Sequence, residues 1–244
     1  MADKDKNIES FRALFEAIEG FGEGCIYRGV RKASYDLVPK VGRFYTKYQF
    51  GPEDIGSVPF ERNMLGQFKL RARAFISESS IPRDDWEWIA VAQHHGLPTR
   101  LLDWTTNPLV AAFFAVETDD DIGGADVRAE DCAIYVIDGQ HVPPAIETQT
   151  NKDPADLGAV GTFIPDHFSR RIAAQGGLFT CHHLPMEPYQ DYQQKLIIRG
   201  QCREDVRIKL NICGINRSTL FPDLDGLSAY VQWRLAAIGS ELVA

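Results

Sequence analysis

The chain has 244 residues, 44% of them hydrophobic and 25% charged, which is typical of a globular protein that can bury a sizeable core. Its net charge of −8 argues against bulk nucleic-acid binding through a basic surface. No apolar signal region opens the sequence and no stretch approaches the roughly 20 apolar residues of a membrane span, so we expect no membrane partner. The five cysteines have no zinc spacing, which predicts reduced thiols and a cytoplasmic protein.

The first predicted elements are a helix and a strand. Apolar residues recur at spacings of three and four over Phe11–Gly20, which predicts a helix. The apolar segment Cys25–Val30 predicts a short strand with Arg28 in its middle. A charged residue in such a strand is rarely buried without a partner, so we expect Arg28 to meet a ligand or a core carboxylate. The neighbouring Gly29 permits close approach by a ligand or another backbone. The candidate caps of the helix are Asn7 and Ser10.

Two longer helices follow a stretch with little pattern. Leu37–Arg43 predicts a loop, and the mixed segment Val41–Gly56 favours no element. Amphipathic spacing predicts helices over Phe60–Ser79 and Trp86–His95. Glu61 lies near the N-terminal end of the first of these helices, where a carboxylate is stabilised. The candidate caps of the second helix are Asp84 and Asp85.

The segment Ala92–Ala115 concentrates more chemically able side chains than any other part of the sequence. Gly96-Leu97-Pro98 ends the preceding helix, because glycine tolerates positive φ and the residue before proline avoids the helical region. Arg100–Leu102 predicts a buried strand, and the wholly apolar run Leu109–Val116 predicts a buried helix. The candidate caps of this helix are Thr105 and Thr106, with Pro108 in its first turn.

Polar residues gather between that strand and that helix. Such a cluster, where a strand ends and a buried helix begins, is a common ligand-site arrangement in mixed α/β folds. The alternative is a structural turn in which Asp103 caps the helix and Arg100 pairs with a carboxylate. Trp104 and Tyr27 either offer a ring face to a ligand or belong to the core.

The second half of the chain predicts several further elements. Glu117–Asp131 predicts an acidic surface loop or disordered tip, and the loop-rich Asp138–Pro165 is a candidate lid or irregular connection. The expected strands are Cys132–Ile137, Gln175–Cys181 with a tight turn at its start, Lys195–Arg199 and Val206–Ile212. The expected helical segments are His167–Ala174, Arg217–Phe221 and Leu227–Ile238. Together the elements predict one α+β domain over residues 1–244, with a mixed or antiparallel sheet flanked by helices and with strands mostly in the first and last thirds.

Several familiar catalytic templates fit the sequence poorly. Cys181 and His182 are neighbours on a predicted strand and point to opposite faces, which disfavours a Cys/His hydrolase. The sequence has no GxSxG turn and no glycine-rich nucleotide loop. The pairs His94-His95 and His182-His183 lack the usual metal-ligand spacings, so we expect no metal. Two kinds of polar group remain as candidates for ligand binding. An arginine guanidinium can bind phosphate or carboxylate through two hydrogen bonds, and short hydroxyl side chains suit ribose.

Three stretches occur in a recognisable order: Tyr27-Arg28-Gly29, Ala92–Thr105 (AQHHGLPTRLLDWT) and Leu220–Leu227 (LFPDLDGL). Together they resemble the FRG domain family. The resemblance covers roughly Ser10–Val231 and implies a single FRG domain with a core of about residues 10–231. By family context, it implies a bacterial setting in phage defence or a toxin system.

A second resemblance bears on chemistry. Tyr27-Arg28-Gly29 is similar to the first-strand Arg motif of arginine-type ADP-ribosyltransferases, and Asp103–Thr106 is similar to their second motif, a Ser/Thr-rich strand before a helix. This resemblance implies an ADP-ribosyltransferase-like fold. It also implies that Arg28 holds the phosphate and ribose side of NAD, while Thr105 or Thr106 shapes the nicotinamide-ribose pocket. The candidate NAD-binding residues are Tyr27, Arg28, Gly29, Arg100, Trp104, Thr105, Thr106 and Gln175.

The same transferases use a glutamate that stabilises an oxocarbenium-like transition state. No ExE or QxE motif occurs near the C-terminal strands, and Gln175, Glu61 or Asp103 would have to substitute. The candidate catalytic residues are Arg28, His94, Asp103 and Glu61. The leading hypothesis is an NAD-dependent enzyme that breaks the nicotinamide N-glycosidic bond and transfers ADP-ribose or releases it to water. The alternative is a non-catalytic nucleotide-binding or protein-interaction module.

Overall fold

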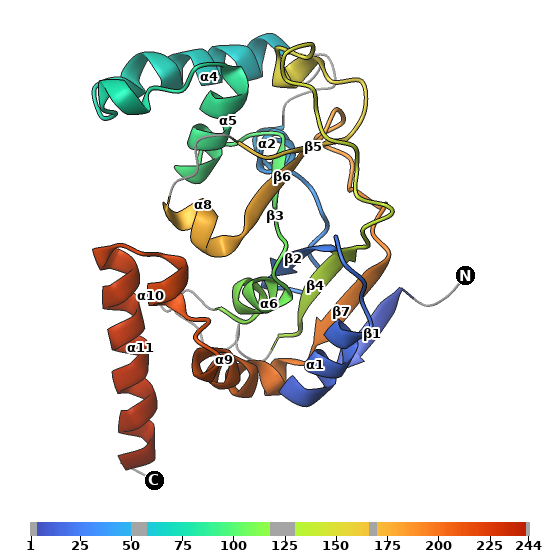
Figure 1. Ribbon diagram of the computed structural model, residues 1–244, viewed down its shortest axis with the longest axis vertical. Helices are drawn as coiled ribbons and strands as arrows, with labels where there is room; N and C mark the ends of the chain where they lie inside the picture. The colour runs from blue at the N-terminus through green and yellow to red at the C-terminus, as the bar shows by residue number, and fades with distance from the viewer. Residues whose placement is uncertain (1–3, 50–57, 118–129, 166–169, 243–244) are drawn as a thin grey trace.

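The computed structural model describes residues 4–49, 58–117, 130–165 and 170–242 (Figure 1). Within these residues seven strands form one sheet in the order β1-β7-β4-β2-β3-β6-β5. Strand β1 pairs with β7 in parallel and the other neighbours are antiparallel, which confirms the expected mixed sheet. The strands are β1 (Asp5–Ile8), β2 (Ile26–Val30), β3 (Leu101–Thr105), β4 (Cys132–Ile137), β5 (Gly161–Phe163), β6 (Gly177–Cys181) and β7 (Gln194–Ile198).

Helices flank this sheet, with α4 and α5 at one end of the molecule and α1 and α9 at the other (Figure 1). Among the described residues, none of the helices has both the length and the apolar character that crossing a bilayer requires. The helices are α1 (Phe11–Glu19), α2 (Lys40–Tyr48), α4 (Val58–Ala72), α5 (Asp85–His94), α6 (Pro108–Val116), α8 (Arg170–Gln175), α9 (Arg203–Ile212), α10 (Arg217–Leu220) and α11 (Leu224–Leu242).

The largest core lies between the sheet and α6. As its apolar sequence predicts, α6 is buried, and it packs against β2 and β4 together with residues of α1 and α9. Gly29 of β2 permits this contact, because a Cβ at that position would lie 2.0 Å from the carbonyl oxygen of Ala111. The close approach expected at Gly29 is therefore made by the backbone of α6.

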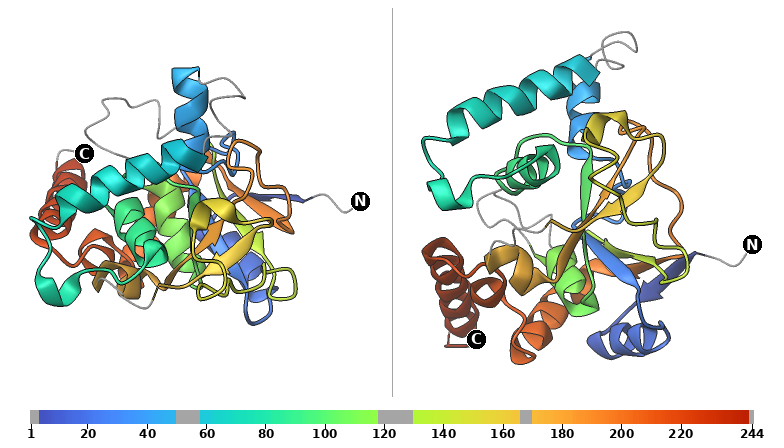
Figure 2. Two further views of the ribbon diagram at one scale, coloured as in Figure 1. Left: turned by 90° about the horizontal axis from the view of Figure 1, so that it is seen from above. Right: turned by 45° about the horizontal axis from the view of Figure 1, so that its top comes forward.

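A separate core fixes α5 to the far end of the sheet. Trp86 of α5 is buried with Leu101 of β3 and Phe179 of β6. Helix α4 runs along the outer side of α5 (Figure 2). An ion pair between Arg62 of α4 and Asp153 ties this outer helix to the segment after β4. The candidate site lies between these two cores.

The segment Val206–Ile212 is helical, so the predicted strand was wrong. Its sequence alternates apolar and polar residues, which is also compatible with a helix that buries only every fourth residue. Val206 and Leu210 are fully buried, whereas Ile208 and Ile212 are exposed. Helix α9 starts upstream at Arg203, with two acidic residues in its first turn.

The loop predicted over Leu37–Arg43 is present at residues 37–39 but was wrong from Lys40 onward, where α2 begins. Helix α2 buries Val41 and Tyr45, which are four positions apart. The helix predicted over Phe60–Ser79 ends at Ala72 instead, and a short 3₁₀ turn follows at Glu78–Ser80. Exposure of Phe75 explains the early end, because the predicted apolar stripe has no core to cover beyond Ala72.

The remaining differences concern caps and strands. Ser10 caps α1 and Asp84 caps α5, and each of them was one of the two candidate caps predicted for its helix. Asn107, and not Thr105 or Thr106, caps α6, with Pro108 at its first position as expected. Four of the seven described strands lie in the first and last thirds of the chain, a smaller majority than expected, while β3, β4 and β5 lie in the middle third. Parts of the predictions for 41–56, 117–131 and 167–174 lie outside the described residues.

Candidate functional site

Strands β2 and β3 separate after a single point of pairing. Tyr27 is paired with Thr105, and from there β2 continues along β4 while β3 continues along β6. In the gap, Arg28 Nη1 donates a 2.6 Å hydrogen bond to the carbonyl oxygen of Asp103. A guanidinium therefore bridges the two strands where the backbone ladder stops. The split turns polar groups of both strands toward open space.

A cavity of about 540 Å³ opens at this split. Its volume falls within the range of roughly 300–1,000 Å³ that small-molecule sites occupy. Its walls come from β2, β3 and β6 together with residues of α2, α5 and α6. The cavity brings together most of the residues that the sequence singles out: Tyr27, Arg28, Gly29, His94, Asp103, Trp104, Thr105 and Gln175.

Asp103 supplies a positioned carboxylate in this cavity. Its Oδ2 accepts a 3.0 Å hydrogen bond from Gln93 Nε2 and lies 3.4 Å from Arg28 Nη1. The side chain of Asp103 remains 58% exposed, whereas that of Arg28 is 19% exposed. Arg28 thus has a carboxylate partner, but that partner faces the cavity and is not a core residue. Asp103 therefore presents an oriented negative charge to whatever occupies the cavity.

The lining of the cavity is more basic than the chain as a whole. Four basic side chains line it: Arg28, Arg31, Lys40 and Arg43. Two carboxylates, Asp36 and Asp103, accompany them. An excess of positive charge in one cavity of a chain with a net charge of −8 indicates an anionic ligand. Sequence reasoning missed Lys40 and Arg43, since they lie in the segment predicted as a loop.

Thr105 and Gln175 hold the base of the cavity in place. Thr105 Oγ1 donates a 2.6 Å hydrogen bond to the carbonyl oxygen of Gln175 and accepts one from the backbone N–H of Asn107. The amide of Gln175 donates to the carbonyl oxygen of Leu220. Thr106 does not line the cavity, and its backbone N–H donates to Gly176. These contacts fix the end of β3 against the turn before β6.

A buried polar chain supports the wall formed by Trp104. Trp104 Nε1 donates to Thr180 Oγ1, which is also hydrogen-bonded to His182 Nε2, both at 2.8 Å. Burial, followed by the nearby charge of Arg28, lowers the pKa of His182 to about 4. His182 is therefore neutral at physiological pH, and its Nε2 accepts a hydrogen bond from the hydroxyl of Thr180. The indole is held in one orientation from behind the cavity.

Glu61 and Arg100 pair with each other away from the cavity. Arg100 Nε and Nη2 donate to the two carboxylate oxygens of Glu61 at 2.8 and 2.7 Å. Both residues are buried, and the hydroxyl of Tyr45 donates to the same carboxylate. This bidentate pair ties α4 to the start of β3. Arg100 thus has the carboxylate partner that the structural alternative expected, and neither residue lines the cavity.

Cys181 is not a nucleophile, and no metal-binding group of side chains occurs in the described part of the chain. Burial raises the pKa of Cys181 to about 12, so its sulfur is a thiol and not a nucleophilic thiolate. The structure describes no group of three or more His, Cys, Asp or Glu side chains suited to a metal ion. His94 lines the cavity, while the ring of the neighbouring His95 lies 5.0 Å away and lines a different hollow.

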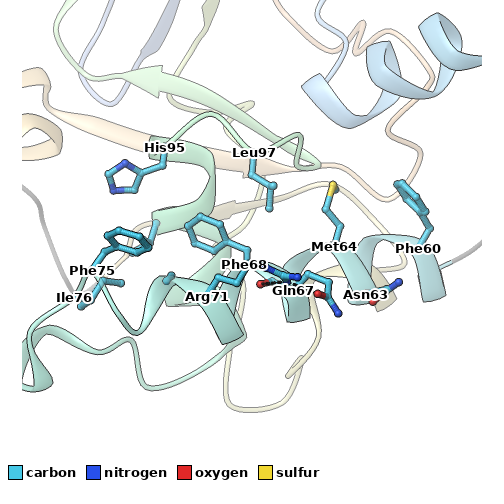
Figure 3. Close-up of a pocket in the computed structure, with 12 residues that line it drawn as sticks. Phe60, Asn63, Met64, Gln67, Phe68, Arg71, Phe75, Ile76, His95 and Leu97 are labelled. Atoms are coloured by element: carbon cyan, nitrogen blue, oxygen red, sulfur yellow. Dashed lines mark hydrogen bonds between the residues drawn. The ribbon is translucent and has the colours of Figure 1, made fainter.

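That second hollow is a largely apolar groove of about 770 Å³ between α4 and α5 (Figure 3). Phe60, Met64 and Phe68 lie along α4 and face Leu97 across the groove. Its chargeable lining residues are Arg71, whose guanidinium donates to Gln67, and His95. The groove is larger than the cavity at the strand split, but its described lining residues include no carboxylate and no converging cations. The smaller cavity is therefore the candidate site.

Comparison with known proteins gives a match to one family model. The FRG domain family model matches residues 23–122. The matched region contains Tyr27-Arg28-Gly29 and the whole of Ala92–Thr105, whereas Leu220–Leu227 lies beyond it. Both strands that bound the split, β2 and β3, fall inside the match. No curated protein and no solved structure matches the chain.

Proposed function

We propose that the cavity at the β2–β3 split, most of whose lining residues lie within the region matched by the FRG family model, binds NAD and cleaves its nicotinamide N-glycosidic bond. One observation carries this proposal: a cavity at the β2–β3 split combines converging cations with one oriented carboxylate. A dinucleotide needs cations for its diphosphate, and glycosidic cleavage needs a negative charge near the ribose. The similarity of Arg28 and Asp103–Thr106 to the ADP-ribosyltransferase motifs points to the same reaction.

Arg28 would bind the diphosphate side of the ligand. Its guanidinium is held by the carbonyl oxygen of Asp103, so the side chain is oriented before a ligand arrives. An oriented guanidinium loses less conformational entropy on binding than a free one does. Aromatic residues of the lining, such as Tyr27, Phe114 and Phe179, offer apolar surface to the ring systems.

Asp103 would stabilise positive charge at the ribose. In the proposed step the bond between the ribose C1′ and the nicotinamide nitrogen breaks, and its electron pair leaves with nicotinamide. The pyridinium becomes neutral nicotinamide, so no acid is required, and the ribose becomes an oxocarbenium-like cation. Water or an acceptor nucleophile then attacks C1′ and loses a proton. Asp103 opposes the developing cation, as Gln93 and Arg28 hold its carboxylate in place.

The alternative function is a nucleotide-binding module without turnover. It is favoured by one observation, the 3.4 Å contact that partly neutralises Asp103 with Arg28. The two functions share the cavity and differ in whether Asp103 is needed for a chemical step.

The test is nicotinamide release from NAD by wild type, Asp103→Asn and Asp36→Asn. The two variants remove one negative charge each from the same cavity. We expect Asp103→Asn to lower kcat at least about 100-fold, as losing one stabilising group of a transition state does. Asp36→Asn should retain most of the rate. Equal rates of nicotinamide release in wild type and Asp103→Asn would refute the role of Asp103. If NAD protects wild type against thermal unfolding but no nicotinamide is released, the binding module is favoured.

A further inference from the structure

Arg43 occupies a position that is unfavourable for positive charge. It lies with Lys40 in the first turn of α2, and that turn has no acidic residue. The N-terminal end of a helix carries partial positive charge from its free N–H groups, so cations there are destabilised. Natural helices usually place Asp or Glu in this turn and place Lys or Arg at the other end. Lys47, near the C-terminal end of α2, follows the usual arrangement.

The backbone N–H of Arg43 donates to the carbonyl oxygen of Pro39, but its guanidinium forms no hydrogen bond or ion pair with any described residue. Two other cations of the lining are engaged: Lys40 Nζ donates to the carbonyl oxygen of Gly96 at 2.6 Å, and Arg28 Nη1 donates to the carbonyl oxygen of Asp103. A guanidinium has five N–H donors and does not lose its charge in proteins. Arg43 thus contributes a full set of donors to the cavity that it lines.

The surroundings of Arg43 disfavour its charge further. Arg43 is an exposed residue, but partial loss of water around its guanidinium, followed by the nearby Arg28, lowers its pKa below the ordinary value. Tyr35 and Asp103 act in the opposite direction but do not offset these effects. An anion between Arg28 and Arg43 would remove the repulsion and complete the hydrogen bonds of both groups.

We propose that Arg43 binds the anionic centre of the ligand opposite Arg28, and so selects nucleotides that carry a diphosphate over uncharged nucleosides. This inference rests on the proposed function and specifies its ligand class. Arg28 comes from β2 and Arg43 from α2, so the two guanidiniums approach the cavity from different walls. A diphosphate suits these two cations better than a single carboxylate does. Each guanidinium can bind one of its two phosphoryl groups bidentately.

The test compares Arg43→Met with Lys47→Met on the same helix. Both variants remove one cation from α2, and only Arg43 lines the cavity. Calorimetric titrations use three probes: ADP, adenosine and inorganic pyrophosphate. We expect Arg43→Met to weaken ADP and pyrophosphate binding at least about tenfold, the range of one charge-assisted hydrogen bond, and to leave adenosine unchanged. Lys47→Met should bind all three probes as wild type does.

Stability provides a second measurement. Because Arg43 has no described partner and suffers repulsion, Arg43→Met should unfold at the same urea concentration as wild type or a higher one. Tight ADP and pyrophosphate binding by Arg43→Met would overturn the inference, as would a clear loss of stability. If wild type binds pyrophosphate through Arg43 but releases no nicotinamide from NAD, the anion site stands and the proposed reaction fails. If wild type binds neither ADP nor pyrophosphate, the inference is wrong.

Discussion

Lowering the pH should destabilise the protein through His182. This imidazole is 2% exposed, and burial, Arg28, His183 and Arg100 together lower its pKa from 6.5 to about 4. The unfolded chain therefore binds a proton at a pH where the folded protein does not. The stability contributed by the neutral imidazole is complete above the unfolded pKa and is lost as the pH falls from about 6.5 toward about 4.

The expected magnitude follows from the size of the shift. A change from 6.5 to about 4 corresponds to about 3 kcal/mol once the titration is complete. At pH 5 the unfolded imidazole is nearly all protonated and the folded one is not, so about 2 kcal/mol is already lost. The pKa values of Asp131 and Asp138 are lowered below the ordinary value for aspartate, so measurements at pH 5 and above largely avoid these groups.

Urea unfolding of wild type and His182→Gln at pH 8 and pH 5 measures this effect. The glutamine retains a hydrogen-bonding group near Thr180 but does not titrate. We expect the free energy of unfolding to fall by about 2 kcal/mol more in wild type than in the variant over this interval. The other histidines are common to both proteins and cancel in the comparison. Equal pH dependence in the two proteins would refute the assignment of a neutral, buried His182.

Three further predictions concern stability and use urea unfolding at neutral pH. Gly29→Ala should destabilise the protein by about 3 kcal/mol or more, because its Cβ would meet the Ala111 carbonyl oxygen at 2.0 Å; a neutral result would contradict the packing of α6. Arg100→Met should cost about 3–5 kcal/mol, since it leaves the Glu61 carboxylate buried without its partner, and a cost under 1 kcal/mol would argue against that burial. Asn107→Ala should cost about 1 kcal/mol by removing the cap of α6, and no change would refute the cap.

The sequence predicted the parts of the site that lie on strongly patterned elements. Arg28 stands out because a charged residue in an apolar strand requires a partner or a ligand, and the structure provides Asp103 at the cavity. The burial of α6 followed from its lack of any polar face. The order of the motifs alone could not show that β2 and β3 pair at one point and then separate.

The missed features have weaker local signals. Helix α2 has only Val41 and Tyr45 as fully buried side chains, and Gly42 between them lowers helix propensity. Gly42 is explained by packing, since a Cβ there would lie 1.9 Å from the carbonyl oxygen of Pro185. Such a contact joins segments far apart in sequence and leaves no local periodicity. Arg43 was therefore hidden in a segment that was predicted to be a loop.

The hydrogen-bond partners of Glu61 also depend on the tertiary structure and could not be predicted from the sequence. Its place near a helix N-terminus made it a candidate catalytic carboxylate, because sequence spacing does not show which cation a carboxylate meets. In the structure Arg100 binds it bidentately, and Asp103 is the candidate carboxylate that faces the cavity. Asp103 was also a candidate, and the contacts of Gln93 and Arg28 give it an orientation that spacing could not reveal.

Nicotinamide release from NAD by the purified protein, measured beside Arg28→Ala, tests the central claim most directly. Arg28 joins β2 to β3 and lines the cavity, so a thermal melt of the variant must first show that it is folded. The account predicts release by wild type and at least about a 100-fold slower release by the folded variant. Release at equal rates from both proteins would contradict the assignment of the reaction to this cavity, and absence of release from wild type would contradict the proposed reaction.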